Sequence, residues 1–184
     1  MTPTTPARER TRREIEQQAM ALFVSRGYDA TSLQDIATAA GCSKATVLYH
    51  FNGKPAVLAA VMEPSRIALH ELVIAAEKLP AAEAQEFILT GFVDLSVQFR
   101  GLLNVVQELI PTIEQHPEFA GLLEDGLRMT ELLAGGTKDQ LEADLAKFAI
   151  NGLLGECRHP GERTDAELHT LCDTALRRIL LLNP

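Results

Sequence analysis

Apolar residues recur at intervals of three and four positions through most of this 184-residue chain, and no other feature restricts its fold as strongly. This spacing places apolar side chains on one face of an α-helix, whereas half-buried strands need a strict alternation that the sequence lacks. Glycine and proline fall between the periodic stretches, where they end helices. The pattern predicts an all-α protein of about nine helices. We expect them at residues 7–26, 32–40, 43–49, from 54 onward, 82–99, 101–110, 117–133, 138–156 and 165–182.

Several of the expected helix ends carry residues that favour capping. Ser43 is a good N-cap, Pro55 suits the first turn of a helix, and Pro64 is expected to kink or interrupt the helix that follows. Three pairs have the spacing of a capping box, in which two side chains bind each other's backbone amides. These pairs are Thr31 with Gln34, Thr137 with Gln140, and Thr164 with Glu167.

Charge is distributed unevenly along the chain. The net charge of −8 by itself argues against a nucleic-acid partner, because phosphate binding draws on Lys and Arg. Residues 1–62, however, hold seven Lys and Arg against five Asp and Glu, whereas the rest hold ten against twenty. A basic head of net charge +2 on an acidic body of −10 suits a small DNA-reading domain.

The sequence favours a reducing, aqueous compartment. It lacks a run of roughly 18 apolar residues, and no apolar segment follows its basic start. Its three cysteines, Cys42, Cys157 and Cys172, are too few and too scattered for a disulfide framework. We therefore expect a cytoplasmic protein with no membrane partner.

Segments 32–40 and 43–49, joined by a short turn at Gly41, have the length and punctuation of a helix-turn-helix. Helix pairs with an intervening glycine also occur in many α-proteins, so the pattern alone leaves that plainer interpretation open. The second helix adds chemistry, because Val47 and Phe51 are spaced for the core. The residues left facing outward suit phosphate and base-edge contacts. They are Lys44, Ala45, Thr46, Tyr49 and His50.

A set of residues in the first third of the chain forms a specific combination. It comprises the apolar stripe ending in Leu22-Phe23, then Gly27-Tyr28, Thr31, Ile36-Ala37, Gly41, Ser43, Thr46, His50-Phe51, Lys54 and Leu58. With this set, residues 15–58 resemble the N-terminal domain of the TetR family of bacterial regulators. Leu48 departs from the pattern, because the family usually has a tyrosine there. Tyr49 stands one position later, about 100° around the helix.

The resemblance implies a helix-turn-helix DNA-binding domain at residues 1–55 and a ligand-binding and dimerisation domain at residues 56–184. It implies a homodimeric transcriptional repressor of palindromic, double-stranded operator DNA. Lys44, Ala45 and Leu48 would face base edges with Gln34, and Lys54 would bind a phosphate at a helix start. The full DNA-binding set is Ser32, Gln34, Ser43, Lys44, Ala45, Thr46, Leu48, Tyr49, His50 and Lys54. A flexible basic arm or a solvated helix start would contain Arg8, Arg10, Arg12 and Arg13.

The resemblance also implies a small, largely apolar effector and a dimer formed by the last two helices. Residues 87–110 interleave apolar and polar side chains as a pocket requires, although amphipathic helices would show the same stripes. Gly152 and Gly155 would let two helices approach closely. The expected ligand-binding residues are Phe87, Phe92, Phe99, Leu103, Asn104, Gln107 and Glu108. The expected dimer residues are Phe148, Gly152, Leu168, Leu171, Ala175, Leu176 and Ile179.

Other classes of function stay open. An activator of the same family would share every feature above, and a protein-binding adaptor would bind no operator. A metal-sensing module could use Cys157, His159, His169 and Cys172, and Cys42 could sense thiol chemistry, although positions near apolar stripes favour packing roles. Enzyme activity is not expected, because nucleophile-elbow, zinc-protease and phosphate-loop motifs are absent. We expect no cofactor and no bound metal.

Overall fold

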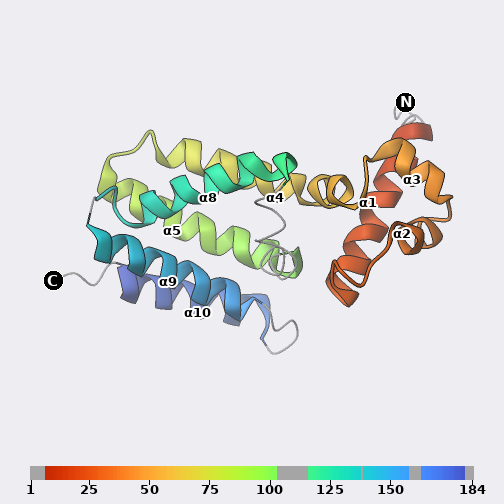
Figure 1. Cartoon of the computed structure of the whole chain (residues 1–184). Coiled ribbons are helices and arrows are strands. Elements are labelled where there is room, and N and C mark those ends of the chain that lie inside the picture. The colour runs from red at the N-terminus through yellow and green to blue at the C-terminus, as the bar shows by residue number, and fades with distance from the viewer. Residues whose placement is uncertain (1–6, 103–115, 138, 158–162, 181–184) are drawn as a thin grey trace, which may run out of the picture.

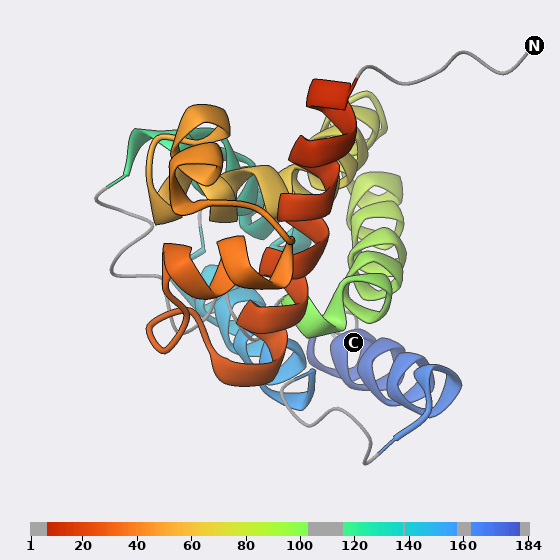
Figure 2. The same cartoon turned by 90° about the vertical axis from the view of Figure 1, so that its right-hand side faces the viewer.

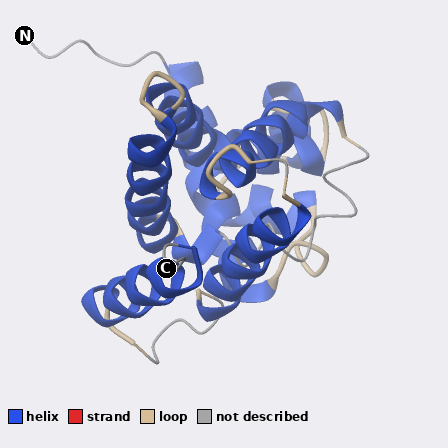
Figure 3. Ribbon diagram, turned by 90° about the vertical axis from the view of Figure 1, so that its left-hand side faces the viewer, coloured by secondary structure: helices blue, strands red, loops and turns tan. Residues whose placement is uncertain are grey.

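The structure, a computed structural model, describes residues 7–102, 116–137, 139–157 and 163–180. The regular elements of these residues are eight α-helices and one 3-10 helix, which confirms the all-α prediction (Figures 1 and 3). A small N-terminal bundle lies at one end of the long helix α4 (Lys54–Ala76). Two helices of the body pack along the rest of α4, and the last two helices of the chain pack against those two (Figure 1). The helix expected at 101–110 lies outside the described residues from position 103 onward.

Three helices form the N-terminal bundle: α1 (Ala7–Arg26), α2 (Leu33–Ala39) and α3 (Lys44–His50). Each contributes a fully buried side chain to one core, and these are Ile15, Ile36 and Val47. Burying such a side chain stabilises the fold by about 1.5–3 kcal/mol. Leu102 and Phe119, from outside the bundle, are buried in the same core. The bundle is therefore completed by residues of the body.

The N-cap of α2 is Ser32, so the predicted pairing of Thr31 with Gln34 is wrong. The Asp35 amide donates to the Ser32 hydroxyl at 3.1 Å, and the Ser32 amide donates to the Asp35 carboxylate at 2.9 Å. Thr31 is buried, and its hydroxyl donates to the Gly27 carbonyl at 2.8 Å. The capping box therefore lies one position later than predicted, with Ser32 in place of Thr31 and Asp35 in place of Gln34.

Helix α4 (Lys54–Ala76) belongs to both halves of the molecule. It passes Pro64 without a break, so the predicted interruption does not occur. Its first turns bury Val57 and Leu58 in the N-terminal core, and its last turns bury Val73 in a second core. One helix is thus a wall of both cores.

The body consists of α5 (Ala81–Gln98), the 3-10 helix η1 (Pro117–Phe119), α8 (Ala120–Leu133), α9 (Gln140–Glu156) and α10 (Asp165–Leu180). Helix α5 contacts α4, α8 and α10, while α9 and α10 pack against each other. Viewed from the bundle end, the body lies behind α1 to α3 (Figure 2). The second core includes Ile88, Leu89, Leu133 and Leu176.

The starts of the last two helices differ in how well they were predicted. The capping box of Thr164 and Glu167 is confirmed, since the Thr164 amide donates to the Glu167 carboxylate at 2.8 Å. The pairing of Thr137 with Gln140 is wrong, because Asp139 is the N-cap of α9. The Thr137 hydroxyl instead accepts the Asp139 amide at 3.1 Å.

Replacing Ser32 by Ala should lower the free energy of unfolding by about 1 kcal/mol, because the first turn of α2 loses its side-chain acceptor. The Ser32 hydroxyl and amide also lower the pKa of Asp35. The contribution of Asp35 is therefore present at neutral pH and lost as the pH falls through that lowered pKa. Urea denaturation across a pH series measures both effects. Ser25→Ala is the control, because the Ser25 hydroxyl donates only to carbonyls of its own helix. Equal stability of Ser32→Ala and wild type at neutral pH would contradict the capping role.

Candidate nucleic-acid interface

A tight turn at Gly41 joins α2 to α3. The φ angle of Gly41 is 63°, a left-handed conformation that glycine adopts without strain. The Cys42 amide donates to the Ala37 carbonyl at 2.9 Å, which reverses the chain. The Ser43 hydroxyl then accepts the Thr46 amide at 3.0 Å and confirms the predicted N-cap of α3. The two helices pack against each other as a helix-turn-helix.

Helix α3 divides into a buried and an exposed face as its spacing predicted. Val47 is fully buried and Phe51, its C-cap, is 4% exposed. Leu48 and Tyr49 are 48% and 69% exposed, respectively. The outward face of α3 comprises Lys44, Ala45, Leu48 and Tyr49. A cation, a phenol and an apolar side chain are therefore presented to solvent on one short helix.

Polar groups flank this outward face. Thr46 and His50 are half-buried at its edges, and the Tyr49 and His50 rings meet edge to face with centroids 5.2 Å apart. Ser32 and Gln34 are exposed at the start of α2. These groups can donate and accept hydrogen bonds without first leaving the core, which is what contacts to phosphates and base edges require.

Lys54, predicted to bind a phosphate, already has partners within the domain. Its Nζ donates to the Tyr28 carbonyl at 2.9 Å and lies 4.0 Å from the centroid of the Tyr28 ring. The preceding Gly53 is the N-cap of α4, with a φ of 90° and no side-chain cap. Lys54 thus ties the start of α4 to the loop after α1, and the sequence offered no signal for this contact.

The four N-terminal arginines lie on the first turns of α1, so the flexible arm is wrong for these positions. The helix already begins at Ala7. Arg13 pairs with Glu9 at 3.2 Å and Arg12 pairs with Glu16 at 3.0 Å, both one turn apart. The helix-start interpretation is the one that holds, and two of the four, Arg8 and Arg12, contact residues of α3.

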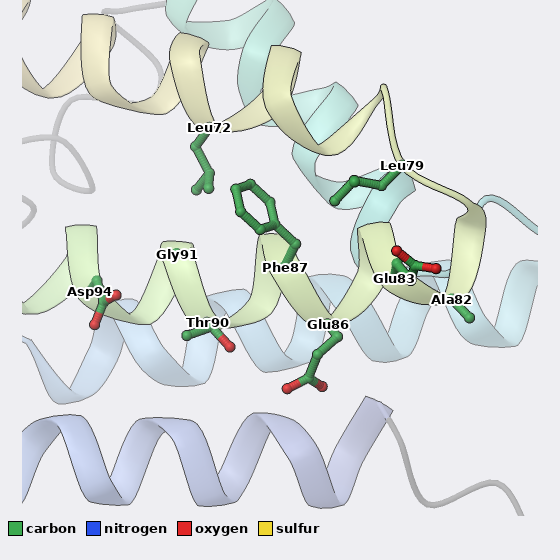
Figure 4. Close-up of a pocket in the computed structure, with 9 residues that line it drawn as sticks. All are labelled: Leu72, Leu79, Ala82, Glu83, Glu86, Phe87, Thr90, Gly91 and Asp94. Atoms are coloured by element: carbon green, nitrogen blue, oxygen red, sulfur yellow. The ribbon is translucent and has the colours of Figure 1, made fainter.

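In the body, α4 and α5 border an open groove of about 780 Å³ (Figure 4). Leu72 of α4 and Phe87 of α5 point toward each other across it, with Leu79 nearby. Gly91 allows this approach, because a Cβ there would lie 2.3 Å from a Leu72 methyl carbon. The charged residues that line the groove are all acidic: Glu83, Glu86 and Asp94.

Of the seven predicted ligand-binding residues, the structure describes three, and these lie in different surroundings. Phe87 lines the groove and is 42% exposed. Phe92 is buried in the second core, and Phe99 is the C-cap of α5. The remaining four, Leu103, Asn104, Gln107 and Glu108, lie outside the described residues.

The predicted dimer residues on α10 divide between core and surface. Leu168 and Leu176 are 3% and 1% exposed and belong to the second core of their own chain, so their predicted outward role is wrong. Leu171 is 37% exposed, and Ala175 and Ile179 are half-buried. The apolar stripe of α10 fills the core of its own chain first.

Helix α9 presents a more continuous apolar face. Phe148 is 69% exposed, and a Cβ added at Gly152 or Gly155 would meet no atom within 4 Å. Leu141, which was not predicted, is 65% exposed. It lies two helical turns before Phe148, so the spacing of the two was an available signal.

The candidate sensing residues have other roles here. Cys157 and Cys172 are buried in the second core, and burial raises the pKa of the Cys157 thiol to about 11. A protonated, buried thiol is unreactive at neutral pH. His169 bonds to Asp94 at 2.9 Å, and His159 lies outside the described residues. Within the described ranges, no three His, Cys, Asp or Glu side chains are grouped as metal ligands.

The same described ranges contain no helix whose length and apolarity would suit a membrane span.

Sequence comparisons match the N-terminal part of the chain. Residues 15–61 match the family described as "Bacterial regulatory proteins, tetR family". The HTH-type transcriptional regulator SrpR of Pseudomonas putida is 43% identical over 54 residues, which is 29% of this chain and 25% of SrpR. The biofilm operon icaADBC HTH-type negative transcriptional regulator IcaR of Staphylococcus aureus (strain Newman) is 41% identical over 44 residues, 24% of each chain. The matches span about a quarter of the length of these relatives.

Likeness in fold extends over almost the whole chain. The ketosteroid transcriptional regulator KstR2 of Mycobacterium tuberculosis has a TM-score of 0.71, covering 96% of this chain and 95% of that one at 16% identity. A putative TetR-family transcriptional regulator from Mesorhizobium loti MAFF303099 has a TM-score of 0.58, covering 97% and 98% at 23% identity. At these identities the likeness shows the fold alone.

Proposed function

We propose that this chain, whose residues 15–61 match the TetR family, acts as a homodimeric transcriptional repressor of palindromic operator DNA that is released by a small molecule. The outward face of α3 is the observation that carries the proposal. It presents Lys44, Leu48 and Tyr49 to solvent, and Leu48 is exposed there although its side chain is apolar. Such a face suits the major groove of DNA.

The contacts divide by chemistry. Lys44 and Gln34 can donate to or pair with base edges, while Ala45 and Leu48 offer apolar contacts to thymine methyl groups. Phosphates would be bound by the polar groups around them. These are Ser32, Ser43, Thr46, Tyr49, His50 and Lys54. Residues 1–55 would read DNA, and residues 56–184 would dimerise and bind the effector in the cytoplasm.

Dimerisation would use the exposed face of α9 together with Leu171 of α10. Phe148 and Leu141 are large apolar side chains left open to solvent, and Gly152 leaves room for a partner helix to approach. A twofold axis through this face would pair the two copies. Two heads on that axis would read half-sites about one DNA turn, or a multiple, apart.

The effector would act by moving α4 relative to the body. Helix α4 is held to α8 by His70, whose Nδ1 lies 3.0 Å from the buried carboxylate of Asp125, and by the ion pair of Glu77 with Arg128. The groove between α4 and α5 suits a small apolar molecule, because two of its three carboxylates are already paired, Glu86 with Arg177 and Asp94 with His169. A molecule bound there would shift α4, which is also a wall of the N-terminal core.

The names of two similar proteins support parts of this proposal. IcaR is named a negative transcriptional regulator, which supports repression. KstR2 is named a ketosteroid regulator, which supports a largely apolar effector. An adaptor that binds only proteins would show no salt-dependent association with DNA.

Replacing Lys44 or Gln34 by Ala should relax base preference at particular positions of the operator by roughly 1–3 kcal/mol each, because a base-edge contact is lost. Replacing Lys54 by Ala should weaken binding about equally on all DNA sequences. It should also lower the salt slope, the steepness with which the logarithm of the binding constant falls with the logarithm of the salt concentration, by about one. Selection of bound sequences from random DNA, followed by fluorescence anisotropy over a salt series, measures both. If selection enriches no sequence, the proposed function fails. If Lys54→Ala weakens binding without changing the slope, Lys54 acts only through its contacts with Tyr28.

Replacing Phe148 by Glu should give monomers in analytical ultracentrifugation and abolish operator binding, because a charge cannot be buried between two copies of α9. Gly152→Glu should do the same. Leu127→Glu is the matched control, since Leu127 is equally exposed, at 67%, but lies on α8. A dimer that persists in both α9 variants would place the interface elsewhere.

An effector should release operator DNA by 5–150-fold, which corresponds to about 1–3 kcal/mol of coupling. A thermal-shift screen of apolar amines and neutral apolar molecules would identify stabilisers, which are then tested for operator release. Phe87→Ala should reduce the thermal shift, whereas Leu127→Ala, outside the groove, should not. A molecule that binds at Phe87 and leaves operator affinity unchanged would disprove the coupling.

A further inference from the structure

Arg12, on the second turn of α1, makes contacts in three directions. Its Nε lies 3.0 Å from a carboxylate oxygen of Glu16, on the same helix. Its Nη1 donates to the His50 carbonyl at 3.4 Å, and its Cζ lies 4.5 Å from the centroid of the Phe51 ring. Glu16 therefore orients the guanidinium, while the other two contacts reach the C-terminal end of α3.

That end of α3 matters because it carries Tyr49 and His50, two of the side chains that would meet DNA. Helix α3 has only seven residues, too few to be stable by itself, so packing sets its orientation. Its last carbonyls have no partner within the helix and carry the negative end of the helix dipole. A guanidinium placed there donates to a carbonyl, complements the dipole and stacks on the ring of Phe51.

The neighbouring arginines make different contacts. Arg13 forms an exposed ion pair with Glu9, and the Cζ of Arg8 lies 5.6 Å from the centroid of the exposed Tyr49 ring. Arg10 is exposed on the same helix. Arg12 is the one of these four whose described hydrogen bonds reach the backbone of α3.

We propose that Arg12 is a positioning residue that holds the last turn of α3 against α1, in the orientation that Tyr49 and His50 need to contact DNA. The proposal rests on the proposed function for its DNA readout, whereas the contact itself belongs to the free protein. The Arg12 side chain is 44% exposed, so a direct phosphate contact is the competing role. Replacing Arg12 by Lys distinguishes the two roles. Lysine keeps the charge for a phosphate but lacks the planar group that stacks and donates in fixed directions.

The test compares Arg12→Lys, Arg12→Ala and Arg10→Ala in the full chain. Arg10→Ala is the matched control, because it removes the same charge from the same helix without a contact to α3. Operator affinity is measured by fluorescence anisotropy over a salt series. Both Arg12 variants should bind about tenfold more weakly with an unchanged salt slope, because ordering of α3 is lost and no phosphate contact is removed. Arg10→Ala should bind more tightly than either.

A second measurement follows α3 without DNA. The Phe51 amide donates to the Val47 carbonyl at 2.9 Å, so its hydrogen exchange reports the last turn of α3. NMR should show this exchange faster by about tenfold in Arg12→Lys and Arg12→Ala, with the α2 amides unchanged. Wild-type binding by Arg12→Lys, with a slope lower by about one in Arg12→Ala, would identify a phosphate ligand and overturn the proposal. Unchanged exchange at Phe51 would also overturn it. If the wild-type chain binds no DNA, the proposed function fails, and the exchange rates still decide whether Arg12 holds α3.

Discussion

Everything in this fold depends on the burial of α4 in two separate cores. Its first turns pack Val57 and Leu58 among the N-terminal helices, and its last turns pack Val73 among the helices of the body. Because α4 contributes side chains to both cores, a shift of α4 in one core would change its packing in the other. Leu102 and Phe119 strengthen this dependence, because both come from the body and are buried in the N-terminal core. The part that would read DNA and the part that would bind an effector are therefore physically coupled through α4.

Within the N-terminal bundle, the short helix α3 is oriented by few contacts. Val47 and Phe51 anchor it by burial, Ser43 satisfies its first turn, and Arg12 contacts its last. Burial gives most of the stability, whereas the polar contacts fix direction. Lys54 has a comparable role at the start of α4, where its ammonium group donates a hydrogen bond to the carbonyl of Tyr28 in the loop after α1. Arg12 and Lys54, which the sequence suggested for DNA contacts, thus also hold parts of the N-terminal bundle together.

The N-terminal bundle and the body differ in the charged and apolar side chains that they expose. Three carboxylates of the body line the groove beside Phe87, while Arg8 and Arg12 of α1 contact the region of α3. Two large apolar side chains that remain well exposed, Leu141 and Phe148, lie two turns apart on α9. This separation would let the proposed DNA binding, effector binding and dimerisation use different faces of a small protein.

The sequence by itself determined the helical class, most helix bounds and the buried pair on α3, because these follow from periodicity and local spacing over a few turns. Its particular residues between positions 15 and 58 also carried the resemblance to the TetR family. The sequence placed the caps of α2 and α9 at the wrong residues, since Thr31 and Thr137 satisfy the same spacing rule as the true N-caps Ser32 and Asp139. Tertiary structure decided which apolar stripes face inward. Leu168 and Leu176 lie in the core of their own chain, whereas Phe148 is exposed. Amphipathic spacing cannot reveal this difference, because it shows that a helix has an apolar face but not what covers that face. The partners of Arg12 and Lys54 were also decided by the fold, since His50 lies 38 residues from Arg12 and Tyr28 lies 26 residues from Lys54, and only packing brings them together.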